Sequence, residues 1–345
     1  MESLRPLQRA KFTDVLDYGI FLFRKHFKKL FIINLIFNIP VMLLLAILNP
    51  VFTEQYWSFI NPTDIVAADP ADILSSMFTL YAMLFGSLAL QGLYTVTVKN
   101  VMEGTMVKII YSGTVLNRER TIKQAVKECF GQFGTLFLGR MIYILIQSAV
   151  FIGIYIILII GMFAVVFSTM GIAAASVAAP LGSVLLTVLG ILAAIVILIF
   201  VALLVGFFYG KYWMFLPAVC IEQQKAGSSI GRCNELGKNG FKLIALTFTF
   251  GYMLIGLFPL TVSSAFNVAG LASGSFNVEI IRIGTVITQI FSELLRPLLT
   301  CILTALYITL KVKREGLDIE IALWEIKREE RERKKRMLQE APNVN

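Results

Sequence analysis

The chain has 345 residues, of which 57% are hydrophobic and 15% charged, and its mean hydropathy is +0.78. A soluble domain carries roughly a quarter of charged residues, so this composition excludes an ordinary soluble protein and is typical of a multi-pass membrane protein. The formal net charge of +9 comes without a basic stripe interleaved with aromatic residues, which argues against nucleic-acid binding.

Six apolar segments are long enough to cross a bilayer. We predict spans at residues 30–49, 76–98, 141–167, 183–209, 243–264 and 285–310. The first contains Pro40, which a membrane helix tolerates where neighbouring helices satisfy the freed carbonyl. No short apolar core with a cleavage site precedes this span, so we expect it to remain in the mature protein.

Lysine and arginine are distributed unevenly over the segments between these spans. They gather before the first span, after the second, after the fourth and after the sixth, whereas the other three loops hold only Arg282. The positive-inside rule therefore places both termini in the cytoplasm and residues 49–75, 168–182 and 265–284 outside. We expect a multi-pass protein of the bacterial inner membrane.

Short amphipathic stretches precede three of the spans at intervals of about 110 residues. The first puts five apolar residues on one helical face: Phe12, Leu16, Ile20, Phe23 and Phe27. The second repeats this face with Ile122, Val126, Cys129, Phe133 and Leu136. Thr121 is a candidate N-cap of the second stretch, and a weaker third copy begins near Ser229 and keeps Cys233 and Leu236.

This pattern predicts an all-α membrane domain over residues 1–310, built from repeats at about 1–110, 111–220 and 221–320. Each repeat would consist of an interfacial helix and a helical hairpin. The interfacial helices would either meet the anionic headgroups of the lipid bilayer or act as elbows packed beneath the bundle.

Residues 311–345 form a charged tail in which every position from Lys327 to Arg336 is charged. Acidic residues precede basic ones at i,i+4, as in Glu329 and Arg333, which predicts a solvated helix. The alternative is that residues 317–340 dock a membrane or cytoplasmic protein partner.

Residues 310–320 read LKVKREGLDIE. This closely resembles the C-terminal signature LRVRREGxDLE of the glycerophosphoryl diester phosphodiesterase membrane-domain family, a group of multi-pass bacterial proteins. The segment 215–238 is similar to that family's loop, a glutamate followed by RSxxLxKG, although Arg232-Cys233 replaces the usual Arg-Ser. The resemblance singles out Glu222, Arg314, Glu315, Gly316, Asp318 and Glu320.

In some relatives a separate barrel performs the hydrolysis, and we expect no such barrel in this chain, so the resemblance implies no catalytic residue. The signature has a physical reading as well. Gly316 is expected to adopt the left-handed conformation that ends the sixth span, and Asp318 to help cap the helix that follows.

The sequence contains no recognisable catalytic, cofactor-binding or metal-binding motif. The sole histidine, His26, lies among Arg24, Lys25, Lys28 and Lys29, and we interpret it as a solvated interfacial side chain. The four cysteines show no C-x-x-C spacing. We therefore expect no enzyme activity and no cofactor.

One polar group stands inside a predicted span, where Gln289, Glu293 and Arg296 recur at helical spacing beside Pro297. An unpaired ionisable group there costs roughly 2.5–3.5 kcal/mol on insertion scales. The residues would act either as a structural ion pair or as a transport site. We favour the structural pair, because the other spans contain few polar residues that could continue a path.

These observations favour an accessory or scaffold protein of the bacterial cell envelope without catalytic activity. A small-solute or lipid transporter that uses Glu293 and Arg296 is the alternative, and an envelope-lipid enzyme is the third possibility. A large polar cavity that reaches Glu293 would favour transport, whereas a solid core with apolar, lipid-facing surfaces would favour the scaffold.

Overall fold

The computed structural model describes residues 5–60, 70–176, 180–272 and 278–340. Within these ranges the protein is all-helical and contains no strand. The elements are η1 (Arg5–Arg9), α1 (Phe12–Ile60), α3 (Pro70–Val96), α4 (Val98–Thr114), α5 (Ile122–Gly131), α6 (Phe133–Ser176), α7 (Pro180–Trp213), α8 (Phe215–Cys220), α9 (Ala226–Gly237), α10 (Phe241–Ala272), α11 (Val278–Glu315) and α12 (Leu317–Glu340).

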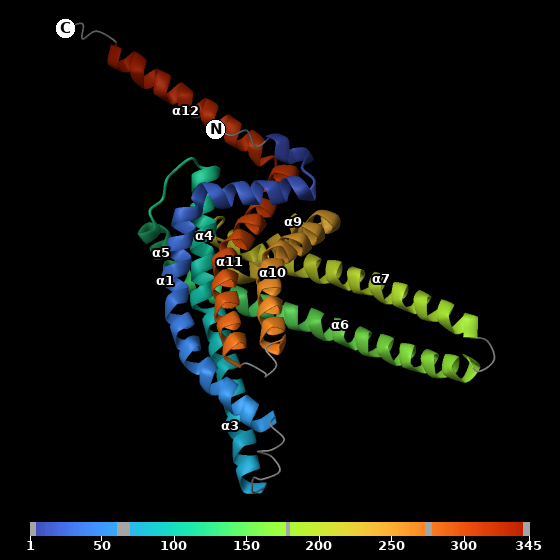
Figure 1. Cartoon of the computed structure of the whole chain (residues 1–345). Helices are drawn as coiled ribbons and strands as arrows, with labels where there is room; N and C mark the ends of the chain where they lie inside the picture. The colour runs from blue at the N-terminus through green and yellow to red at the C-terminus, as the bar shows by residue number, and fades with distance from the viewer. Residues whose placement is uncertain (1–4, 61–69, 177–179, 273–277, 341–345) are drawn as a thin grey trace.

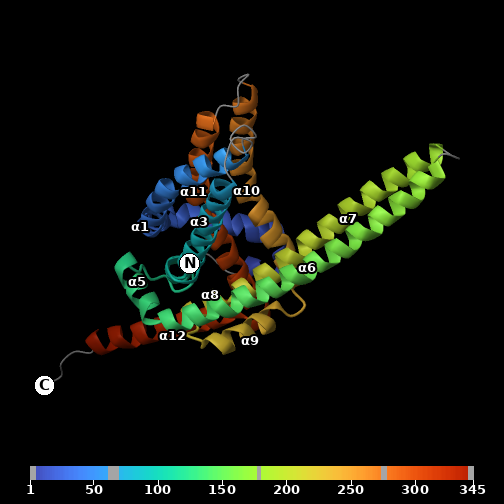
Figure 2. The ribbon, with the colours of Figure 1, turned by 90° about the horizontal axis from the view of Figure 1, so that it is seen from below.

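The long helices pair into three hairpins, α1 with α3, α6 with α7, and α10 with α11 (Figure 1). The first and third extend toward the same side, whereas the α6–α7 hairpin projects away from them (Figure 2). Helix α6 has 44 residues and is therefore about 66 Å long, roughly twice the hydrocarbon thickness of a bilayer.

Among the described residues, five helical segments are long and apolar enough to cross a membrane, which is consistent with a multi-pass membrane protein. They are Leu74–Thr114, Phe133–Ile159, Ala194–Cys220, Phe241–Gly270 and Ile283–Glu315. Their outer surfaces expose large apolar side chains, such as Phe151 at 63% and Leu198 at 70%. Such surfaces suit a lipid solvent better than water.

The first predicted span lies in α1, where the side chains beyond Val41 are outside the described residues. The three loops predicted to face outside the cell are centred on 61–69, 177–179 and 273–277, which are also outside them. A sixth span, the repeats and the topology therefore stay predictions.

The core lies where the second helix of each hairpin continues beyond its predicted span. It is formed by α4, α8 and the C-terminal half of α11, and Met106, Phe215 and Tyr307 are fully buried there. The basic residues between the second and third predicted spans were expected in a loop, which is wrong for Lys99 and Lys108, because both lie on α4. Lys108 is buried there because its Nζ lies 3.4 Å from a carboxylate oxygen of Glu128 on α5.

The first amphipathic stretch packs through a different face from the one predicted. Val15 and Leu22 are fully buried, whereas Phe27 of the expected face is 41% exposed. Gly19 explains the difference, because a Cβ atom at this position would lie only 2.7 Å from the Cα atom of Ile302 on α11. The side of α1 with the small residue therefore approaches the neighbouring helix most closely.

The second stretch is divided between α5 and the start of α6, because α5 ends at Gly131, and the third stretch lies in α9. Thr121 caps α5 as predicted, since its side chain accepts a hydrogen bond from the backbone N–H of Gln124 in a capping box. Cys129 and Leu136 are buried as expected, but Phe133 is 37% exposed.

Gly316 separates α11 from α12 with a φ of +64°, as predicted. Asp318 does not cap α12; its carboxylate accepts a hydrogen bond of 2.8 Å from Nε2 of Gln8 instead. Helix α12 then leaves the body of the protein (Figure 1). The ion pairs expected between Glu329 and Arg333 involve a side chain outside the described residues.

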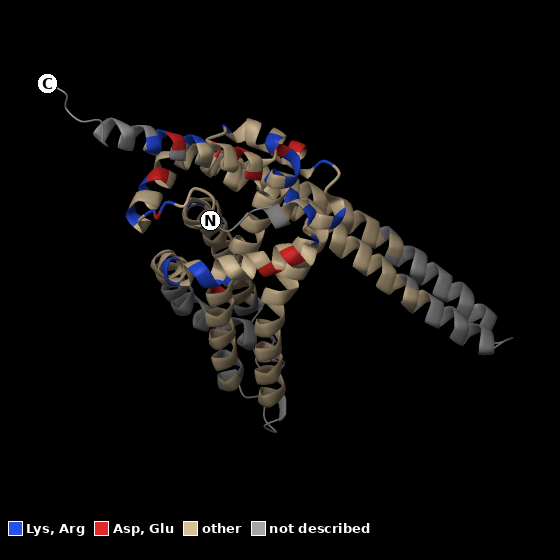
Figure 3. Cartoon of the chain, turned by 90° about the horizontal axis from the view of Figure 1, so that it is seen from above, with Lys and Arg blue, Asp and Glu red and all other residues tan. Residues whose placement is uncertain are grey.

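Charged residues gather at one end of the molecule, on α5, α9, the turn after α4 and the start of α12, and we call this region the charged end. Figure 3 shows the hairpins largely tan and these elements blue and red.

Candidate functional site

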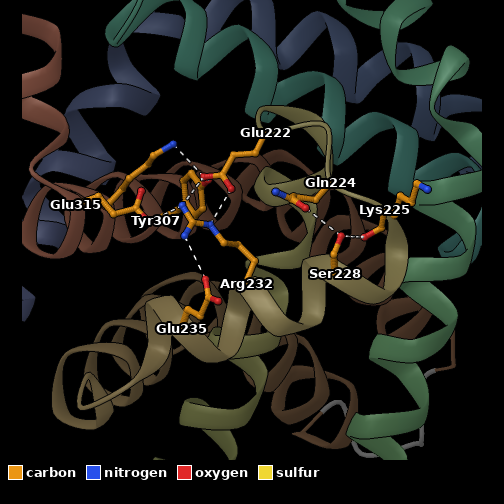
Figure 4. A network of polar contacts seen from close by, with 9 residues as sticks. Glu222, Gln224, Lys225, Ser228, Arg232, Glu235, Tyr307 and Glu315 are labelled. Carbon is orange, nitrogen blue, oxygen red and sulfur yellow. Dashed lines mark hydrogen bonds and ion pairs between the residues drawn. The ribbon is translucent and has the colours of Figure 1, made fainter.

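Glu222 is the centre of an ion network at the charged end. It follows α8 in the chain and is only 11% exposed at its side chain. Arg232 of α9 donates two hydrogen bonds to its carboxylate, of 2.8 Å from Nε and 3.1 Å from Nη2. Tyr307 of α11 donates a bond of 2.6 Å to Oε1 (Figure 4). Lys311 of α11 donates one of 2.9 Å to the same oxygen.

Arg232 extends this network to two further carboxylates. It makes an ion pair with Glu315 at the end of α11, and its Nη1 lies 3.3 Å from Oε2 of Glu235 (Figure 4). Glu235 is 71% exposed, so this last contact is the most solvated of the set. The network thereby ties the loop after α8, helix α9 and the end of α11 together.

Burial alone would favour the neutral form of Glu222, but the hydrogen bonds from Arg232, Tyr307 and Lys311 lower its pKa from 4.5 to about 2. Hydrogen bonding to Glu222 raises the pKa of Arg232 above its ordinary value. A carboxylate with so low a pKa is a poor proton donor or acceptor near neutral pH. The arrangement is therefore suited to holding elements together rather than to acid–base chemistry.

Two of the residues that the family resemblance singles out, Glu222 and Glu315, meet in this network through Arg232. Arg314 and Glu320 do not join it, since both are exposed and form no ion pair with any residue that the structure describes. The role of Tyr307 has no local sequence pattern, because its buried hydroxyl donates to a carboxylate 85 positions away.

The predicted pair inside the membrane segment is present on α11. Nη1 of Arg296 lies 2.6 Å from Oε2 of Glu293, and the two side chains are 31% and 16% exposed. Asn38 of α1 donates a hydrogen bond of 2.8 Å to the same carboxylate. Asn34 donates one of 2.6 Å to the backbone carbonyl of Glu293.

These residues border a polar pocket of about 220 Å³ between α1, α3, α4 and α11. It is lined by Asn38, Val41, Gln91, Tyr94, Thr95, Lys99, Gln289, Glu293 and Arg296. The expectation that the other spans supply few polar groups is therefore wrong for the first two. Asn34 and Asn38 could have indicated this pocket from the sequence, because two amides one helical turn apart in an apolar segment need polar partners.

A buried ion pair continues from this pocket toward the charged end. Glu103 of α4 lies 3.9 Å from Nζ of Lys99 and 3.4 Å from Nη1 of Arg140 on α6. The side chains of Glu103 and Arg140 are 8% and 6% exposed, so each charge depends on the other for stabilisation. The pair connects α4 with α6, the first helix of the second hairpin.

The four cysteines are free and buried, and burial raises the pKa of Cys233 to about 12. In the described part of the chain, no group of three or more His, Cys, Asp or Glu side chains could hold a metal ion.

The fold and its apolar surfaces thus define an all-helical protein with several helices long enough to cross a membrane. Compared with known proteins, the chain matches no protein-family model, no curated protein and no solved structure.

Proposed function

We propose that this protein is a non-catalytic accessory or scaffold protein of the bacterial inner membrane, with both termini in the cytoplasm. The observation that carries the proposal is helix α12, which leaves the body of the protein at the charged end and bears an apolar stripe. The stripe consists of Ile319, Leu323 and Ile326, which recur at i, i+4 and i+7 and are 54–59% exposed.

The charge of α12 favours a protein partner over the membrane surface. Residues 317–340 contain seven acidic and seven basic residues, so the helix carries no net charge. Binding to an anionic bilayer by an interfacial helix depends on excess positive charge, which α12 lacks. An apolar helical segment of a membrane-associated protein would cover the stripe in the manner of a helix packed into a groove.

The buried core supports a structural role. Residues 101–111 of α4 and 298–310 of α11 are almost entirely buried. The carboxylate of Glu222 is held by fixed partners and has a pKa of about 2, which also suits a static contact.

The proposal is tested by isolating the full chain from native membranes and identifying the proteins bound to it. Replacing Leu323 and Ile326 with serine should abolish recovery of a specific partner. Arg331→Ser is the matched control, since Arg331 is exposed on α12 but off the stripe. Equal recovery with both variants would refute docking through the stripe.

A transporter is the second candidate, and the polar pocket at Glu293 favours it. The pocket joins residues of α1, α3, α4 and α11, and the Glu103–Arg140 pair extends the polar path. Its volume of about 220 Å³ is below the roughly 300–1,000 Å³ of typical ligand pockets, which is why we rank transport second.

We also propose that the hairpins are three copies of one unit. Each is preceded by an amphipathic helical stretch, which is the first part of α1, α5 or α9. We further propose that the chain belongs to the glycerophosphoryl diester phosphodiesterase membrane-domain family. The proposal rests on the signature at residues 310–320, and the network that joins Glu222 and Glu315 supports it.

A further inference from the structure

A basic hollow of about 550 Å³ opens between the first part of α1 and the turn that follows α4. Six of its lining residues are cationic: Arg24, Lys25, Lys28, Lys29, Arg118 and Arg120. Only Glu119 is acidic. The hollow is larger and more strongly charged than the pocket at Glu293. None of the residues in the ion network at Glu222 lines it.

Half of these cations have no ion-pair partner among the described residues. Lys29 lies 3.3 Å from Glu119, which is 91% exposed, and Arg120 pairs with Glu128. Arg24, Lys28 and Arg118 form no ion pair with any residue in the described ranges. Cations brought so close together repel one another, and a bound anion would relieve that repulsion.

The turn that carries Arg118 is held in a fixed conformation. The backbone N–H of Arg118 donates a hydrogen bond of 2.9 Å to the carbonyl of Ser112. The preceding residue, Asn117, adopts a left-handed φ of +47°. Asparagine tolerates this conformation better than most residues do. The cationic side chains of the turn are therefore presented toward α1 from a defined backbone.

His26 lies in the wall of the hollow and is not the solvated side chain that the sequence suggested. Its ring packs against α4, where a Cβ atom at Gly113 would lie 2.6 Å from Cε1. Its Nε2 atom is buried and has no hydrogen-bond partner among the described residues. Burial, with Lys25 and Lys29 nearby, lowers the pKa of His26, while Glu119 opposes this shift.

We infer that this hollow binds a phosphate group, carried either by a soluble phosphorylated compound or by a lipid headgroup. Arginine and lysine together suit phosphate, because arginine donates paired hydrogen bonds and lysine adds a point charge. The volume lies within the range of small-molecule sites. A nucleic acid would instead need an extended basic stripe.

The surroundings of the hollow suit both sources of phosphate. Ile109 and Phe27 give it an apolar wall. Farther along α1, Ile32 and Ile36 are 46% and 56% exposed, so acyl chains could lie against them while the headgroup occupies the hollow. The inference is independent of the scaffold proposal, because it uses none of the residues of α12.

The sole histidine of the chain makes a direct test possible, since its imidazole gives one assignable NMR signal. We would measure the pKa of His26 in the full chain in micelles of dodecyl maltoside, a detergent without phosphate, with and without inorganic phosphate. A second arm adds phosphatidic acid to the micelles. Sodium chloride at matched ionic strength controls for screening of Lys25, Lys29, Arg118 and Glu119.

Bound phosphate should raise the pKa of His26, because a nearby anion stabilises the imidazolium form. A rise with phosphatidic acid alone identifies a lipid headgroup, a rise with inorganic phosphate alone identifies a soluble ligand, and a rise with both supports the general phosphate site. Arg118→Gln and Lys28→Gln, both at exposed positions, should weaken binding about tenfold or more.

Arg314→Gln is the matched control, since Arg314 is an exposed arginine of the charged end outside the hollow. It should bind phosphate like the wild type. The inference is overturned if neither source of phosphate shifts the pKa of His26 beyond the chloride control. It is also overturned if Arg118→Gln and Arg314→Gln weaken binding equally.

Discussion

Glu222→Gln should destabilise the protein more than any other single charge removal at the charged end. Glutamine keeps the size of the side chain but loses the negative charge that Arg232 and Lys311 share. These two cations are only 20% and 14% exposed at their side chains, so water compensates poorly for the lost partner.

The size of the effect follows from the pKa of Glu222. The pKa of Glu222 falls from its ordinary value of 4.5 to about 2 in the folded protein. This difference corresponds to about 3 kcal/mol in the free energy of unfolding. Between pH 2 and pH 4.5 the unfolded chain binds more protons than the folded one, so the free energy of unfolding rises with pH over this range. The contribution is complete above pH 4.5 and is lost as the pH falls toward 2.

The assay is denaturant unfolding of the purified protein in detergent at pH 7. Glu235→Gln is the matched control, because Glu235 contacts the same Arg232 but is 71% exposed. It should cost less than about 1 kcal/mol. A cost for Glu222→Gln below about 1 kcal/mol, or equal costs for both variants, would refute the reasoning.

Three other perturbations test the fold and the membrane site. Glu293→Ala or Arg296→Ala should each lower the free energy of unfolding by a few kcal/mol, because the remaining partner is left unpaired. Replacing both residues with apolar ones should restore much of this stability. A stable double variant that loses cellular function would favour transport. Single cysteines at Asp64 and Arg118 should label differently with an impermeant thiol reagent in intact cells, because the native cysteines are buried, and equal labelling would contradict the topology. Leu22→Asp would bury a charge at a fully buried position and should sharply lower the amount of folded protein, so normal abundance would count against the packing of α1.

Local patterns were sufficient to predict the long helices, the cap at Thr121 and the left-handed Gly316. They were not sufficient for α4, because Lys108 reads as a loop residue until its partner Glu128 is known. The buried face of α1 was missed for a related reason. Aromatic residues favour the core in water, but next to lipid they can lie outward while Gly19 makes the closest helix contact.

The candidate sites too could be predicted from the sequence only where their residues are close neighbours in the chain. Glu293 and Arg296 are neighbours on one helix, and their pairing follows from spacing alone. The partners of Glu222 come from α9 and α11, and the basic hollow joins α1 to the turn after α4. Contacts between distant segments depend on the tertiary fold, which a single sequence does not reveal.

Crosslinking in living cells tests the central claim that α12 docks a protein partner. A photoreactive amino acid would replace Leu323 on the apolar stripe or Arg331 off the stripe. The scaffold account predicts a discrete crosslinked protein from position 323 and little from position 331. Crosslinks of equal strength at both positions, or none to protein at position 323, would contradict it.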